Sequence, residues 1–169
     1  MNKYSIILIT ILLLLLAACG NNAAEEAEEV RDQALNEEFW QTYDYFMTVQ
    51  TLNAGQIEYY YPQVMEGLNK QITTLNELDI QTEDVAEIRN SFVQGFEAMQ
   101  RAYEPLEGEY EAMYNDTLST DLEENYSAEI EKSNEQMTNA LAGLMEYFEF
   151  EEGEEEEIMR ELEPWMTEQ

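Results

Sequence analysis

The sequence contains no histidine and only one cysteine, Cys19, among its 169 residues. Without histidine the chain cannot carry out Ser-His-Asp or Cys-His catalysis, bind zinc or haem through histidine, or form the Glu-x-x-His ligand sets of di-iron bundles. A lone cysteine cannot form a disulfide within the chain. The seven glycines are scattered and form no phosphate-binding loop. We therefore expect no cofactor.

Basic residues are also scarce, with 7 Lys and Arg against 38 Asp and Glu and a net charge of −31. Such a surface repels nucleic acid phosphates and anionic lipid headgroups, whereas divalent cations and basic proteins remain possible partners. Self-repulsion of this size is screened by salt, which suggests work in high external salt or at alkaline pH, with an ordinary habitat as the alternative. Because 44% of the residues are hydrophobic, the chain can still form one core.

The first residues have the layout of a signal peptide. Lys3 precedes an apolar run from Ile6 to Leu16 that is broken only by Thr10. A membrane-spanning helix needs about 20 apolar residues, and this run is about half that length before Cys19. The run therefore predicts an export signal rather than a permanent span.

The four residues Leu16, Ala17, Ala18 and Cys19 resemble the lipobox of bacterial lipoproteins. The resemblance implies that the Cys19 thiol receives a diacylglycerol group and that signal peptidase II cuts after Ala18. It also implies that the mature chain is held on the outer face of the bacterial cell membrane. Two acyl chains hold a protein on a bilayer where one gives only marginal binding.

The sequence predicts three parts: a signal peptide over 1–18, a flexible acidic tether over 19–29, and one helical domain over 30–169. Residues 20–29 carry no large apolar side chain. From Val30, apolar residues recur at steps of three and four, which indicates amphipathic helices. The first is expected to run from Val30 to near Gly55. The second is expected to start near Tyr61, after a connector over 55–60, because Pro62 suits a first turn.

Two further helical runs follow. The third is expected to start after Thr82 and to reach Met113 with a kink at Pro105. Thr120 and Glu123 form a capping box ahead of the fourth. An acidic interruption over 151–157 precedes a short fifth segment over 158–166. The sequence thus predicts an all-α, up-down bundle of four long helices plus a short C-terminal helix.

Three consecutive tyrosines, Tyr59, Tyr60 and Tyr61, form a candidate contact surface. Consecutive residues at the head of a helix cannot all face the core, so at least one ring is expected to be exposed. Exposed tyrosines serve protein interfaces and stack on sugars. The alternative is that the rings pack across the end of the bundle.

Two acidic clusters are candidate calcium sites, one around Asp116 and Asp121 and the other around Glu154 and Glu155. Neither has the ligand spacing of an EF-hand, so a solvated acidic turn is the alternative. The nine methionines suit core filling better than copper binding.

We therefore expect a non-enzymatic, membrane-anchored lipoprotein that binds a protein or a cell-wall component. A calcium-binding surface lipoprotein and a carboxylate-based enzyme are the alternatives, although with this many acidic residues carboxylate pairs arise by chance.

Overall fold

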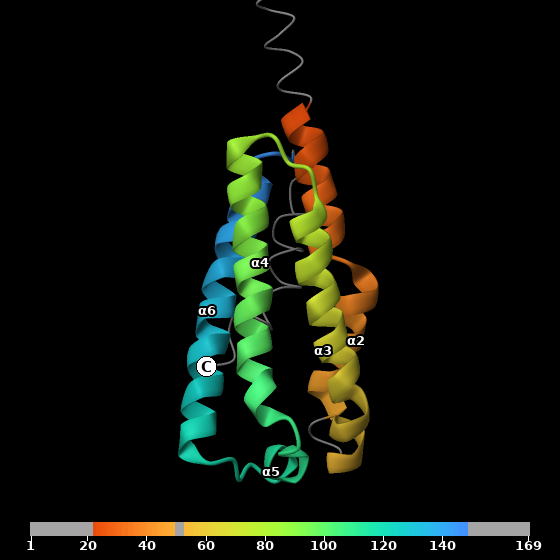
Figure 1. Ribbon diagram of the computed structural model, residues 1–169, viewed down its shortest axis with the longest axis vertical. Coiled ribbons are helices and arrows are strands. Elements are labelled where there is room, and N and C mark those ends of the chain that lie inside the picture. Colours follow the sequence, from red (N-terminus) through yellow and green to blue (C-terminus); the bar gives the residue numbers. More distant parts are fainter. Residues whose placement is uncertain (1–21, 50–52, 149–169) are drawn as a thin grey trace, which may run out of the picture.

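The computed structural model describes residues 22–49 and 53–148, and the regular structure in these ranges is entirely helical. In Figure 1 the chain descends through two helices, ascends, descends again, crosses the lower end and returns upward. This confirms the all-α up-down bundle. The elements are a helix over 22–34, α2 (Glu37–Val49), α3 (Ala54–Glu77), α4 (Glu83–Tyr103), the 3₁₀ turn η1 (Glu104–Leu106), α5 (Tyr110–Tyr114) and α6 (Thr120–Met145).

One hydrophobic core runs between these helices. Each long element contributes fully or almost fully buried side chains to it, among them Val30, Phe46, Leu68, Phe96 and Leu144. Burial of a side chain of this size stabilises the fold by about 1.5–3 kcal/mol, before the entropy cost of ordering the chain. The apolar series in the sequence therefore identifies the buried faces correctly.

Two glycines let α4 and α6 approach closely. A Cβ added at Gly95 of α4 would lie 2.9 Å from Cε of Met137, and one added at Gly143 of α6 would lie 2.7 Å from Cγ1 of Ile88. Each helix thus accepts a large side chain of the other where it has no side chain of its own.

The predicted tether is wrong over residues 22–29, which are helical. Glu26 and Ala27 are buried, and the Thr82 N–H donates a hydrogen bond of 2.9 Å to Oε2 of Glu26. Alanine and glutamate are strong helix formers, and alanine packs without a large side chain. A pattern of large apolar residues therefore does not reveal this helix. The hydrogen bond of Glu26 fixes the helix to the turn before α4.

The prediction of one helix from Val30 to near Gly55 is also wrong, because the chain forms two successive helices there, the helix over 22–34 and α2. The helix over 22–34 ends before Asn36, whose Oδ1 accepts the N–H of Phe39 at 3.1 Å and so caps α2. The Trp40 indole N–H donates to the Ala34 carbonyl at 3.0 Å, which satisfies a group left free at the end of the first helix.

The predicted start of the second helix is wrong. Helix α3 begins at Ala54, where Oδ1 of Asn53 accepts the Gln56 N–H, so Gly55 lies in its first turn rather than at the end of the preceding helix. Pro62 is accommodated inside α3 because it and Glu58, one turn earlier, are both exposed. Water can therefore reach the Glu58 carbonyl, which has no backbone donor because Pro62 lacks an N–H.

Pro105 ends a helix instead of bending one. Helix α4 stops at Tyr103, η1 contains Pro105, and Gly108 then adopts φ +86° before α5. This left-handed backbone favours glycine and turns the chain across the lower end of the bundle. The predicted cap at Thr120 is one residue late, because the Ser119 hydroxyl accepts the Leu122 N–H. The acidic segment 151–157 and the expected fifth helix over 158–166 lie outside the described residues.

Candidate functional site

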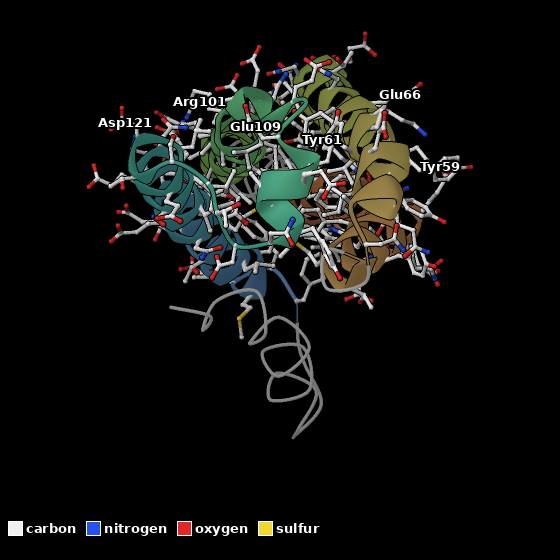
Figure 2. The ribbon with its side chains drawn as sticks, turned by 90° about the horizontal axis from the view of Figure 1, so that it is seen from below. Tyr59, Tyr61, Glu66, Arg101, Glu109 and Asp121 are labelled. Atoms are coloured by element: carbon white, nitrogen blue, oxygen red, sulfur yellow. The ribbon has the colours of Figure 1, made fainter. Side chains whose placement is uncertain are left out.

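The three consecutive tyrosines of α3 have three different environments. Tyr61 is 4% exposed and its hydroxyl donates to the Tyr103 carbonyl at 2.9 Å, whereas Tyr59 is 66% exposed. Tyr60 is partly buried between these extremes. Successive residues point about 100° apart around a helix, which separates the three rings. In Figure 2 the Tyr59 side chain lies at the outer edge of α3, whereas Tyr61 lies toward the bundle interior. Tyr61 therefore does not belong to the exposed contact surface.

Tyr45 of α2 joins the surface in its place. Its ring is 44% exposed and meets that of Tyr60 edge to face, with the ring centroids 4.8 Å apart. Tyr60 meets Tyr59 in the same way, also at 4.8 Å. We call Tyr45, Tyr59 and Tyr60 the tyrosine cluster. Edge-to-face contacts of this kind hold aromatic rings in fixed relative positions.

Two carboxylates adjoin the tyrosine cluster along the chain. Exposed Asp44 and Glu58 directly precede two of its members in the chain. Desolvation and the neighbouring hydroxyls of Tyr45 and Tyr59 raise the pKa of Tyr60. The surface thus presents aromatic rings with negative charge beside them.

A groove of about 290 Å³ lies between α2 and α3, and none of the three rings of the tyrosine cluster lines it. Gln63 connects the groove to the tyrosine cluster, because its side-chain amide donates to the Tyr59 carbonyl at 3.0 Å and also lines the groove. Lys70 lies further along the groove and pairs with Glu38 at 3.9 Å. The lining residues are Asn36, Glu38, Phe39, Thr42, Gln63, Glu66, Gly67, Lys70 and Gln71. Most of these lining residues are polar, and Phe39 is the aromatic residue among them.

A second group of tyrosines lies at the same end of the bundle, with Tyr43 and Tyr103 buried and Tyr126 partly buried. The Tyr103 hydroxyl lies 3.0 Å from that of Tyr43 and 3.3 Å from that of Tyr126, and donates to the Met47 sulfur at 3.2 Å. Burial, together with the neighbouring phenols of Tyr43 and Tyr126, raises the pKa of Tyr103 well above its ordinary value. A phenol that stays protonated cannot act as a base at neutral pH. The hydroxyl contacts of Tyr103 link α4 to α2 through Tyr43 and Met47, and to α6 through Tyr126.

The candidate calcium sites receive no support from the described residues. Asp116 adopts φ +53° in the turn before α6, and Asp121 lies in the first turn of that helix. In Figure 2 Asp121 points outward at the edge of the molecule. Within 22–49 and 53–148, no group of three or more acidic side chains is placed to hold a metal ion. Glu154 and Glu155 lie outside these ranges.

The lipobox residues Leu16, Ala17, Ala18 and Cys19 likewise lie outside the described residues. No helix in the part of the chain that the structure describes is long and apolar enough to cross a bilayer. Comparison of the chain with protein-family models, curated proteins and solved structures finds no match in any of the three.

Proposed function

We propose that this chain is a lipid-anchored, extracytoplasmic lipoprotein without enzymatic activity, and that its bundle binds a partner protein through the tyrosine cluster. The partner carries exposed lysine or arginine side chains. The resemblance of residues 16–19 to a lipobox supports the anchor. The exposed aromatic rings support the contact surface.

The observation that carries the proposal is the concentration of exposed rings at one place. The exposed large hydrophobic side chains of the described residues are Tyr45, Tyr59 and Tyr114, and two of these three belong to the tyrosine cluster. Tyrosine is enriched in protein interfaces because it offers a large contact area and a polar tip. Because the rings already pack against one another, binding freezes few additional side-chain rotations.

The charge of the chain favours a basic partner. Lysine and arginine bind over the faces of aromatic rings, with about 0.5–1 kcal/mol gained at an exposed ring. Asp44 and Glu58 lie beside the tyrosine cluster, and the net charge of −31 attracts a basic surface from a distance. An acidic partner or a nucleic acid would be repelled.

An arginine-rich synthetic peptide provides a direct probe. We expect the wild-type protein to bind it, and Y45A/Y59A to bind it roughly 5- to 30-fold more weakly, which corresponds to about 1–2 kcal/mol for two rings. Isothermal titration calorimetry at fixed ionic strength measures both dissociation constants. The tyrosine-to-alanine substitutions leave the net charge unchanged, so the comparison isolates the rings.

Tyr114 provides a matched control, because it is 42% exposed and lies outside the tyrosine cluster. We expect Tyr114→Ala to bind like the wild type. If both variants bind the peptide equally well, the attraction comes from general acidity and the tyrosine cluster is not the contact surface. Circular dichroism confirms that each variant is folded.

The anchor is tested separately with Cys19→Ser. We expect the wild-type chain to gain the mass of a diacylglycerol group and to partition into detergent when it is expressed in a bacterial host. The variant should remain uncleaved and unmodified. A wild-type mass without lipid would contradict the anchor and leave the peptide-binding result standing.

A further inference from the structure

The N-terminal helix leaves little chain between the bundle and the proposed lipid. The helix already includes Asn22. Only three Cα-to-Cα steps of 3.8 Å separate that residue from Cys19, so their Cα atoms cannot be more than about 11 Å apart. A flexible tether over 19–29 would have allowed several times this distance.

The same helix is fixed to the rest of the bundle near its start. Glu26 is 7% exposed; its Oε1 accepts the Asn22 side-chain amide at 2.6 Å, and its Oε2 accepts the Thr82 N–H at 2.9 Å. Ala27 and Val30 are fully buried on the same helix. The beginning of this helix is therefore fixed to the turn between α3 and α4.

The bundle has two distinct ends, as Figure 1 shows. The start of the 22–34 helix, the α3–α4 turn and the end of α6 lie at one end, whereas α5 and the beginning of α3 lie at the other. Tyr59 and Tyr60 are near the beginning of α3, and Glu77 is its last residue. At 1.5 Å per residue, the tyrosine cluster is about 26 Å from Glu77 along the helix axis.

From these contacts we infer that the bundle stands upright on the membrane. The α3–α4 turn faces the lipid headgroups, and the tyrosine cluster is presented at the far end, about 26 Å further out along α3. This orientation rests on the proposed lipidation of Cys19. The chain as a whole carries a net charge of −31. Anionic headgroups therefore repel the sides of the bundle, which opposes a flat orientation while the short attachment holds one end at the membrane.

Two exposed glutamates of α3, Glu58 and Glu77, allow a matched test, since their Cα atoms lie about 28 Å apart along the helix. Glu58→Cys and Glu77→Cys change the charge equally. In the lipidated mature protein Cys19 is blocked, so the new thiol takes a fluorescent donor dye. The protein is reconstituted into vesicles of phosphatidylglycerol and phosphatidylcholine that carry an acceptor on their headgroups.

We expect energy transfer to the headgroups to be clearly greater from position 77 than from position 58. Insertion of ten Gly and Ser residues after Gly20 should remove most of that difference. Equal transfer from the two positions in protein that carries the diacylglycerol mass would overturn the upright orientation alone. A mature protein without that mass would overturn the lipidation and the orientation together.

Discussion

The close packing of α4 against α6 makes Gly143 a sensitive position. In Gly143→Ala the new Cβ would lie 2.7 Å from Cγ1 and 3.0 Å from Cδ1 of Ile88. Ile88 is 8% exposed, and a β-branched side chain in a helix has essentially one χ1 rotamer, so it cannot move aside. Overpacking of this kind costs about 1–3 kcal/mol. The gain in helix propensity is at most about 1 kcal/mol and is smaller in the last turn of α6.

Gly95→Ala is the matched control on the partner helix. Its Cβ would meet Met137 at 2.9–3.1 Å. Methionine has three rotatable bonds, and Met137 is only partly buried, so this side chain can shift at little cost. Because Gly95 lies inside α4, the propensity gain applies in full. We expect a stability change close to zero for Gly95→Ala and a loss of about 1–2 kcal/mol for Gly143→Ala.

Urea unfolding followed by far-ultraviolet circular dichroism measures both free energies of unfolding. A second background separates the clash from other effects: in Ile88→Ala, which removes the atoms that collide, Gly143→Ala should cost less than it does in the wild type. If Gly143→Ala is as stable as Gly95→Ala, or if its cost is unchanged in the Ile88→Ala background, the proposed packing of α4 on α6 is wrong.

Two further predictions concern stability. Pro62→Ala should stabilise the protein by about 1–3 kcal/mol in urea unfolding, because it restores a backbone donor at an exposed position inside α3; an unchanged urea midpoint would contradict this. Burial and the nearby charges of Glu107, Tyr110 and Glu104 raise the pKa of Tyr61 to about 12. Its contribution to stability should be complete below pH about 10 and should decline as the pH rises toward 12, because the unfolded chain loses the proton first. Urea midpoints measured against pH should therefore fall less steeply in Tyr61→Phe, and parallel curves would argue against a role for this phenol.

The long helices could be predicted because their burial depends on a regular pattern of large apolar side chains. Val85, Ile88, Phe92, Phe96 and Met99 keep steps of three and four, and all five are buried on α4. Thr82 precedes the first helical residue as expected, although its side chain makes no capping hydrogen bond. Its backbone N–H is bound instead by Glu26, which comes from a distant part of the chain. Local sequence contains no sign of that contact.

The wrong predictions of where helices begin and end share a physical cause. Local residues allowed more than one boundary, and tertiary contacts and exposure to water determined which one formed. Pro62 is tolerated because it faces water, whereas Pro105 coincides with the end of α4. Local propensity treats the two prolines alike. The helix over 22–34 is stabilised by Ala27 and Glu26, which a pattern of large apolar residues does not detect.

The candidate site was only partly accessible from the sequence. The helical spacing of Ile57, Tyr61 and Val64 can be seen in the sequence, and the structure buries all three on one face of α3. Tyr45 could not be added without knowing that α2 packs beside α3, because the two tyrosines that meet are on different helices. An exposed surface assembled from two helices is a tertiary property.

The bond between Glu26 and the α3–α4 turn also has a mechanical meaning. The helix over 22–34 runs along the long axis of the bundle (Figure 1). A pull on its N-terminal end therefore acts parallel to its contacts and loads Glu26, Ala27 and Val30 in shear, so that several contacts bear the force together. Helices pulled sideways lose their contacts one at a time. The proposed lipid on Cys19 would apply force to the helix in this direction.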